Sequence, residues 1–234
     1  MAVFYPSSAP ESISDYASRV DAKQRKGFGP RVRKLHARIG KAHHQAEGMA
    51  FSKALLAGKA TPLQLAALLR SLAPAYRFLE VEAPALALTL GARSMPWVDL
   101  ARSDALEHDL NKLSCLADTP VSAAAAIWLE QLRLLARQSP HRLMAHVYVR
   151  YGGDLSGGQQ LATQAAAILE QNGLPALSFW VFERPTAELK ASLHDAFEEL
   201  ELNQVEDLEL LEEAEVAFQA TQRLLAELEN LTPL

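Results

Sequence analysis

The sequence predicts an all-α protein, and three observations support this fold class. Apolar residues recur at the spacing of helical turns almost everywhere after position 30, which is the pattern of amphipathic helices. Alternating apolar and polar runs, which are typical of strands, are nearly absent. Capping residues followed by proline mark several helix starts, at Thr61-Pro62, Thr119-Pro120 and Ser139-Pro140, because proline is favoured at the first helical position.

These signals place the helices in chain order. The predicted ranges are 31–57 (one helix or two), 62–85, 98–115, 120–137, 140–171, 186–200 and 203–229. Asn203 with Glu206 predicts a capping box at the start of the last helix. We expect one helical domain over 30–230, preceded by an N-terminal extension over 1–29 that is disordered or loosely attached.

The longest predicted connection between helices is 172–185, "NGLPALSFWVFERP". Its aromatic residues Phe179, Trp180 and Phe182 could let it pack back on the helices. Cys115 is the single cysteine and cannot form an internal disulfide. Because it lies beside Leu113, we expect it to be a small buried hydrophobe.

Composition and charge narrow the class of protein. With 49% hydrophobic residues the chain can bury a sizeable core. A formal net charge of −5 gives no general attraction to nucleic acid. No apolar run reaches the roughly 18 to 20 residues that a membrane-spanning helix needs, and the first residues do not resemble a signal peptide. We therefore expect a cytoplasmic protein without a membrane anchor.

Charged residues gather in two segments. An acidic segment covers 198–215, and a basic cluster lies near the start of the first helix. The simplest interpretation of both is a solvated face. The basic cluster consists of Lys23, Arg25, Lys26, Arg31, Arg33, Lys34, Arg38 and Lys41.

The stretch "YVRYGGDLSGGQQLATQAAAIL", 148–169, places four glycines in a predicted helix, where each glycine costs about 1 kcal/mol relative to alanine. Its "LSGGQ" also occurs in ABC transporter ATPases, but those need a GxxxxGK[ST] phosphate loop after a strand, and the sequence has none. The glycines do not match GxGxxG spacing. No glutamate precedes a histidine by three positions, as a di-iron bundle requires.

Two interpretations of the glycines remain. Small residues could allow close packing between helices, or they could let a flat or bulky ligand approach the backbone. Asp154, which lies between the two glycine pairs, favours the second, because a carboxylate beside a cavity can hold ordered water near a reacting group.

At this point the chain resembles the heme oxygenase family. "YVRYGGDLSGGQ" is similar to the glycine-rich distal helix of these enzymes, and "AHHQAEGMAFSKALLAGKAT", 42–61, resembles the segment with the proximal histidine. The resemblance extends from about Arg31 to Leu228. Weaker matches are "SLAPAYRFLE", "RSDALEHDL", "FERPTAELKASL" and "EAEVAFQATQRLLAEL". The family implies a single-domain multi-helix bundle in which heme lies between a proximal helix and a kinked distal helix.

The resemblance implies that His43 is the axial ligand of the heme iron, which accords with the preference of heme iron for imidazole nitrogen. Glu47, one helical turn later, could orient its imidazole. His44 points about 100° around the helix from His43, so both cannot bind one iron. We expect His44 to face solvent or the helix packing.

On the distal side, the resemblance implies that Asp154 organises water that delivers protons during the reaction. Gly153, Gly157 and Gly158 would let the helix backbone approach heme. Tyr76 and Arg150 fit hydrogen-bonded positions around this water. Phe218 would wall the distal pocket, although an ordinary core position is equally consistent with its sequence context. Thr221 stands where relatives tend to have asparagine.

The two heme propionates need cations and hydrogen-bond donors. By resemblance, Lys190 is a basic contact and Tyr148 a hydroxyl donor. His194 stands where relatives commonly have arginine, and His36 and Gly40 stand where they often have basic residues. These departures weaken or relocate the propionate contacts, so attack at the α meso carbon is the family default rather than a firm expectation.

The implied activity is oxidative opening of heme, which is both cofactor and substrate, to biliverdin IXα with release of carbon monoxide and ferrous iron. It consumes O2 and electrons from a separate protein, such as ferredoxin or a flavodoxin with its reductase. The basic cluster would suit an acidic donor of this kind. Two other functions stay open: a heme carrier or sensor that does not degrade heme, and a helical interaction module without a cofactor.

Overall fold

The computed structural model describes residues 28–116 and 122–231, and over these residues it is helical without a strand. The predicted all-α class is confirmed. The helices are α2 (Pro30–Gly48), α3 (Ala50–Leu56), α4 (Pro62–Thr89), α5 (Trp97–Leu100), α6 (Ser103–Lys112), the 3₁₀ turn η2 (Ser114–Leu116), α7 (Ala123–Gln138), α8 (Pro140–Asp154), α9 (Gly158–Gln171), α10 (Thr186–Glu198) and α11 (Gln204–Glu229). Apart from Phe28 and Gly29, the predicted N-terminal extension lies outside the described residues.

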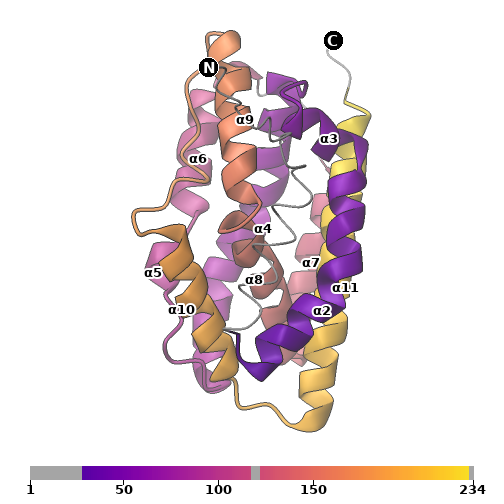
Figure 1. The fold of residues 1–234 in the computed structure, drawn as a ribbon, viewed down its shortest axis with the longest axis vertical. Coiled ribbons are helices and arrows are strands. Elements are labelled where there is room, and N and C mark those ends of the chain that lie inside the picture. The colour runs from indigo at the N-terminus through magenta and orange to yellow at the C-terminus, as the bar shows by residue number, and fades with distance from the viewer. Residues whose placement is uncertain (1–27, 117–121, 232–234) are drawn as a thin grey trace, which may run out of the picture.

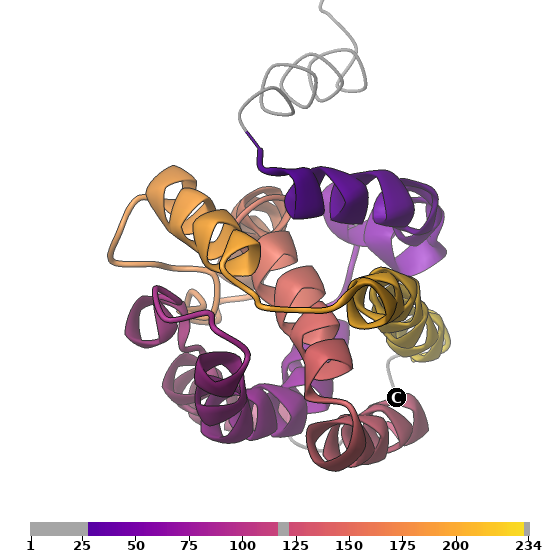
Figure 2. The same cartoon turned by 90° about the horizontal axis from the view of Figure 1, so that it is seen from below.

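Helix α8 is the centre of the bundle. Figure 2 shows it surrounded by α2, α10, α4, α7 and α11. Its sequence explains this position, because apolar or aromatic residues occur on all sides of it and the run from Leu143 to Val149 is buried throughout. The long helices α2 and α11 pack along each other on one flank (Figure 1). Thus α8 contacts α10, the helix with Lys190. Its Tyr148 ring also lies 6.1 Å from the ring of His36 on α2, the helix with His43.

The capping signals gave several helix starts correctly. Thr61 and Gln64 form a capping box at α4, and Asn203 and Glu206 form one at α11. Helix α8 begins at Pro140, although the side chain of Ser139 makes no capping bond. The start predicted at Thr119-Pro120 lies outside the described residues, while Ser122 caps α7 through Ala125 N–H at 2.9 Å.

Two predicted helices are divided. The first ends at Gly48 and resumes at Ala50, so the alternative of two helices is confirmed. The range 98–115 is wrong as one helix, because it contains α5, α6 and η2. The cause is a distant carboxylate: Glu80 of α4 accepts hydrogen bonds from the backbone N–H of Arg102 at 2.6 Å and of Ser103 at 3.1 Å. These bonds cap the start of a new helix at a point where the spacing of apolar residues in the sequence shows no interruption.

The predicted helix 140–171 is broken at 155–157, between α8 and α9. Leu155 (φ −75°, ψ −10°) and Gly157 (φ −61°, ψ −28°) keep right-handed helical backbone, so the break is a kink. None of the four glycines in this stretch has a positive φ. A left-handed turn therefore does not explain the glycines.

The connection 172–185 packs back on the helices as predicted, and Phe179 and Trp180 are buried. Asp109, itself fully buried, accepts the backbone N–H groups of Ser178 and Phe179 at 2.7 and 2.8 Å. Arg102 lies 4.1 Å from the ring centroid of Phe182 and donates to backbone carbonyls of the connection. A buried carboxylate and a buried guanidinium thus hold an irregular segment in place.

The expectation that Cys115 is buried is wrong. Cys115 is exposed in η2, while Leu113 at the end of α6 takes the buried position. Helix α6 ends at Lys112, and after the buried Leu113 the chain turns into η2, so Cys115 does not share the inner face. Among the described helices, none has the length and apolar character needed to cross a membrane.

Candidate functional site

His43 lies on α2 with its side chain 50% exposed. Its Nδ1 is 3.6 Å from Oε1 of Glu47, one turn later, and its ring lies 5.8 Å from that of Phe218 on α11. Nδ1 of His43 thus lies beside a carboxylate, which leaves Nε2 as the nitrogen that can bind a metal. The other oxygen of Glu47 is within hydrogen-bond distance of Nδ1 of His44, at 3.4 Å. His44 is 87% exposed, which confirms that it faces solvent.

The four glycines of the stretch 148–169 fall into two groups, according to the space beside each of them. A Cβ atom added at Gly152, Gly153 or Gly157 would meet no described atom within 4 Å apart from its chain neighbours and the adjacent backbone of its own helix. At Gly158 it would lie 2.9 Å from Cδ1 of Trp180. Close packing therefore explains Gly158, which the sequence had assigned to heme contact, and it does not explain the others. Open space beside Gly153 and Gly157 is what a helix approached by a flat ligand requires.

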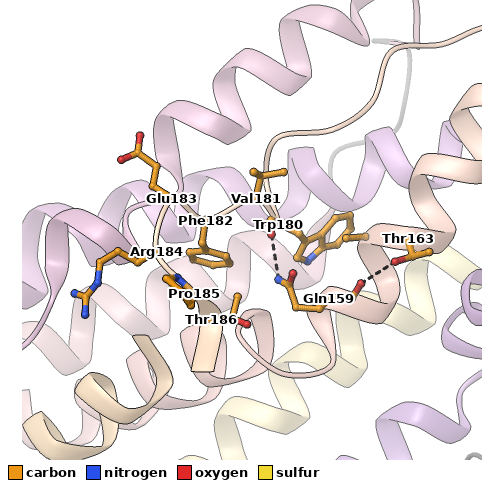
Figure 3. A pocket seen from close by; sticks show the side chains of 10 residues that line it. Gln159, Thr163, Trp180, Val181, Phe182, Glu183, Arg184, Pro185 and Thr186 are labelled. Carbon is orange, nitrogen blue, oxygen red and sulfur yellow. Dashed lines mark hydrogen bonds between the residues drawn. The ribbon is translucent and has the colours of Figure 1, made fainter. Parts of the chain in front are cut away.

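The side chain of Gln159 connects the start of α9 to the connection 172–185. Its amide donates to the carbonyls of Asp154 at 3.2 Å and of Trp180 at 3.0 Å. Figure 3 shows Gln159 and Trp180 beside a surface cleft that Phe182 and Pro185 also line. No residue predicted for the heme site lines this cleft, so it is separate from the predicted site.

Asp154 is buried at the end of α8 with an exposure of 3%. The hydroxyl of Tyr76 donates to Oδ2, and Nη2 of Arg150 lies 3.7 Å from Oδ1. Burial raises the pKa of Asp154 to about 6, against the lowering effects of Arg150, the Tyr76 hydrogen bond and Arg102. The carboxyl group can therefore exchange a proton close to neutral pH.

Arg150 connects three predicted site residues. Its Nε donates to the hydroxyl of Tyr76 at 3.2 Å, and its Nη1 donates to Oγ1 of Thr221 at 3.2 Å. Burial lowers the pKa of Arg150, but Tyr76 and Asp154 favour the cation and the pKa is raised overall. The predicted group of Tyr76, Arg150 and Asp154 is thus brought together, with Thr221 as a fourth member.

A second group lies where α2, α8 and α10 meet. Tyr148 and His194 have rings 5.9 Å apart, and the ring of His36 lies 6.1 Å from the first and 5.7 Å from the second. The hydroxyl of Tyr148 is buried without a hydrogen-bond partner among the described residues. Burial, together with the charges of His36 and Lys190, lowers the pKa of His194 to about 3. His194 is therefore neutral at pH 7.

Phe28 completes this group, and sequence reasoning missed it by placing it in the N-terminal extension. Its ring stacks on His36 at 4.9 Å and meets His194 edge-on at 4.5 Å. A usable signal was present: Phe28 precedes the Gly29-Pro30 helix start, where an apolar residue often packs on the first turns of the helix. We call Phe28, His36, Tyr148 and His194 the ring group.

Comparison with known proteins gives a consistent result. The family model described as "Heme oxygenase" matches residues 32–227. A heme oxygenase of Guillardia theta is 28% identical over 202 residues, covering 83% of this chain and 84% of that protein. Heme oxygenase 1 of Synechocystis is 29% identical over 195 residues, covering 81% of each chain.

Solved structures show the same similarity. Heme oxygenase-1 from Synechocystis, in complex with heme, superposes with a TM-score of 0.78 at 27% identity, over 86% of this chain and 93% of that chain. The heme oxygenase of Leptospira interrogans superposes with a TM-score of 0.72 at 28% identity, over 82% and 97%. The fold and most of the sequence agree with one family, so this chain belongs to the heme oxygenase family.

Proposed function

We propose that this protein opens heme to biliverdin in the cytoplasm, with heme as substrate and cofactor. The observation that carries the proposal is the buried carboxylate of Asp154, held by Tyr76 and Arg150 beside the open space at Gly153. A merely structural carboxylate would need no glycine kink next to it. Family membership supplies the reaction class.

The residues present fit a heme between α2 and the α8–α9 kink. His43 would bind the iron through Nε2, with Glu47 near its Nδ1. Gly153 and Gly157 would leave room for the macrocycle, since no described atom outside their own stretch of helix lies within 4 Å of their missing Cβ positions. When bound, heme supplies the redox-active iron and the meso carbon that is oxidised.

Asp154 would hold water and pass protons. With a pKa of about 6 it is mostly ionised at pH 7 and accepts hydrogen bonds from water. Tyr76 and Arg150 fix the direction of its carboxylate, and Thr221 in turn fixes Arg150. We assign Asp154 the ordering of the water that delivers protons to the reacting oxygen, and Tyr76, Arg150 and Thr221 the positioning of Asp154.

The propionate edge would lie at the ring group. Lys190 brings a cation, and the buried hydroxyl of Tyr148 can donate to a carboxylate. His194 is neutral and can contribute a hydrogen bond without a charge. We propose biliverdin IXα, carbon monoxide and ferrous iron as products, with attack at the α meso carbon as the family default.

Electrons would come from a ferredoxin or a flavodoxin that docks on the basic cluster. Within α2, Arg31 and Lys34 pair with Asp207, and Arg38 pairs with Glu215. Arg33 and Lys41 are exposed. Lys23, Arg25 and Lys26 lie outside the described residues. The docking charge on the described part of the cluster is therefore smaller than its sequence indicates.

The test is turnover of bound hemin with a reductase, ferredoxin, O2 and ascorbate, followed by absorption spectroscopy. The heme band should give way to a biliverdin spectrum. A heme band that stays unchanged would favour the carrier or sensor function instead. His43→Ala should weaken hemin binding by more than about 100-fold, since losing even an outer partner of a metal ligand costs about 10–100-fold. His44→Ala is the matched control and should bind hemin normally.

A further inference from the structure

Helices α2 and α10 cap each other where they meet. The carboxylate of Glu198, at the end of α10, accepts the backbone N–H of Val32 at 2.8 Å and of Arg31 at 3.2 Å. In return, Nη1 of Arg31 donates to the carbonyl of Phe197 at 2.8 Å. An anion thus satisfies the first N–H groups of one helix, and a cation satisfies the last carbonyls of the other. We call this pair of residues the reciprocal cap.

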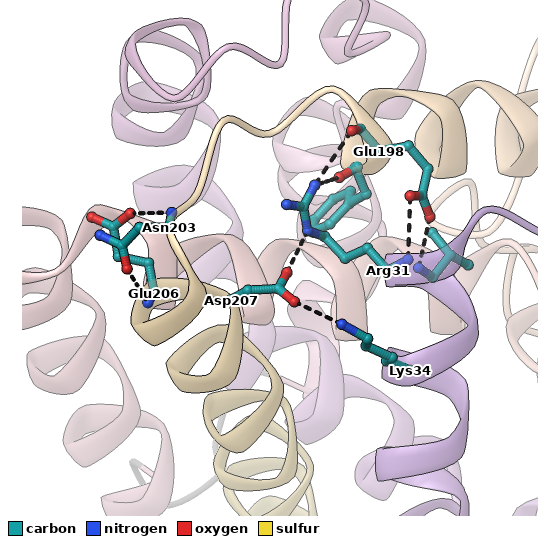
Figure 4. A network of polar contacts seen from close by, with 8 residues as sticks. Arg31, Lys34, Glu198, Asn203, Glu206 and Asp207 are labelled. Carbon is teal, nitrogen blue, oxygen red and sulfur yellow. Dashed lines mark hydrogen bonds and ion pairs between the residues drawn. The ribbon is translucent and has the colours of Figure 1, made fainter.

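The reciprocal cap is closely packed and partly buried. Nε of Arg31 also lies 2.7 Å from Oδ1 of Asp207 in the first turn of α11, which joins a third helix to the junction (Figure 4). The side chain of Arg31 is only 13% exposed. A Cβ atom added at Gly29 would lie 2.2 Å from Cδ of Glu198. The backbone at Gly29 therefore fits closely against the Glu198 side chain.

The two capped helices carry different parts of the proposed heme site. Helix α2 carries His43, while α10 carries Lys190 and His194. Figure 1 shows α2 and α10 converging at the junction and separating away from it. The reciprocal cap is thus the fixed end of two helices, and the angle between them sets where the α10 side chains lie relative to His43.

A planar ligand held at its centre by one imidazole can rotate about the iron–nitrogen bond, and only contacts at its edge fix that rotation. His194 is neutral, so the protein side of the proposed propionate edge carries less charge than an arginine at this position would give. Weaker edge contacts make the placement of α10 more important. Since the meso carbons lie at different positions around the ring, the rotation decides which of them lies toward the reacting oxygen.

We propose that the reciprocal cap of Arg31 and Glu198 sets the in-plane orientation of heme, and therefore which meso carbon is oxidised. This inference rests on the proposed function for its chemical outcome. The hydrogen bonds that Arg31 and Glu198 make among the described residues go to backbone groups of α2 and α10 and to Asp207, none of which is a predicted site residue, so their role is positioning. The predicted consequence is a change in product isomer without a loss of proton delivery.

The experiment uses the full chain with Glu198→Ala. Proton NMR of the cyanide-bound hemin complex counts the sets of shifted heme-methyl signals, and chromatography of the turnover product counts the biliverdin isomers. Wild type should show one dominant set and one dominant isomer. In the variant, the ratio of major to minor form should fall about tenfold, the factor that loss of one charge-assisted hydrogen bond allows.

Two further variants test whether the effect is specific. Glu206→Ala is the matched control, since it removes a carboxylate cap at the nearby start of α11, where Glu206 accepts Asn203 N–H at 2.9 Å. It should leave the ratio unchanged. Glu198→Gln keeps an oxygen for Val32 N–H and should restore most of the wild-type ratio.

The outcomes separate the two proposals. An unchanged NMR ratio in folded Glu198→Ala protein, checked by circular dichroism, would overturn the role of the reciprocal cap. If that variant does not fold, Gly29→Ala decides by the same criterion, because its added Cβ displaces the Glu198 side chain. A wild type with one dominant NMR set but no biliverdin would overturn the proposed function alone.

Discussion

The distal carboxylate and the ring group are both buried, but they are built differently. Around Asp154, charges and hydrogen bonds are balanced by Tyr76, Arg150 and Thr221. In the ring group, aromatic stacking replaces most of these bonds, and the Tyr148 hydroxyl has no described partner. The difference indicates that the group proposed to handle protons is satisfied by its own bonds, whereas the ring group leaves the Tyr148 hydroxyl for a ligand to satisfy.

The largest expected effect is at the distal carboxylate. Asp154→Asn should lower biliverdin formation by about 100-fold or more, because general acid–base assistance contributes about 10²–10⁴-fold. Hemin affinity should stay close to wild type, since Asp154 supplies no iron ligand. Turnover and hemin titration on the same preparation measure both. A variant that binds hemin weakly but turns over normally would reverse the assigned roles.

The pH dependence of turnover tests the same carboxyl group. Its pKa is raised to about 6, so the ionised form predominates above pH 6 and declines below it. Turnover should fall by about tenfold per pH unit below 6. The profile of Asp154→Asn should lack this step. A wild-type profile that stays flat from pH 7 to 5 would exclude the ionised carboxylate of Asp154 as the group that orders the proton-delivering water.

At the proposed propionate edge, loss of Lys190 should weaken hemin binding more than loss of His194. Lys190→Ala should weaken hemin binding by about tenfold and reduce the salt dependence of the hemin affinity, because charge-assisted hydrogen bonds are about twice as strong as neutral ones. His194→Ala should weaken it by about threefold, since a neutral imidazole contributes only a neutral hydrogen bond. Hemin titrations at low and high salt measure this. Equal losses in the two variants would show that His194 becomes charged when heme binds.

The smallest expected effects are those of alanine substitutions at Gly158 and Gly153, which should affect stability and hemin binding differently. Gly158→Ala should lower the free energy of unfolding by about 1–3 kcal/mol, as overpacking against Trp180 does in a filled core. Gly153→Ala should leave that free energy nearly unchanged or raise it slightly, and should weaken hemin binding instead. Thermal denaturation without heme and hemin titration distinguish the two. Equal destabilisation by both would remove the distinction between a packing glycine and a ligand-facing one.

Local signals in the sequence were enough for most of the fold. The Thr61-Pro62 pair and the capping box at Asn203 gave the starts of α4 and α11, because the groups that define each start lie within one turn. The start of α6 could not be found in this way, since Glu80 of another helix supplies its cap. Cys115 was misplaced for a similar reason: where the chain turns after Lys112 depends on packing rather than on periodicity.

In the candidate site, too, local signals identified residues, whereas contacts between distant segments were not predicted. The motif gave the identity of Asp154 and its neighbours, but not the hydrogen bonds that orient them, which come from α4 and α11. Because the four glycines were interpreted together, the packing of Gly158 against Trp180 was not predicted. Trp180 lies in a connection without regular structure. Phe28 was missed because its partners His36 and His194 come together only through the packing of α2 against α10.

The fixing of α9 by Trp180 and Gln159 has a consequence for product release. On one side of the 155–157 kink, Asp154 is held by buried bonds, and on the other, Gly158 is packed against the Trp180 ring. Dihedral changes that widen the space proposed for heme are therefore confined to the exposed turn at Ser156 and Gly157. Gly157→Ala stiffens that turn and fills part of this space, so it should weaken hemin binding and slow the departure of biliverdin more than its formation, as hemin titration with single-turnover and steady-state rates would show.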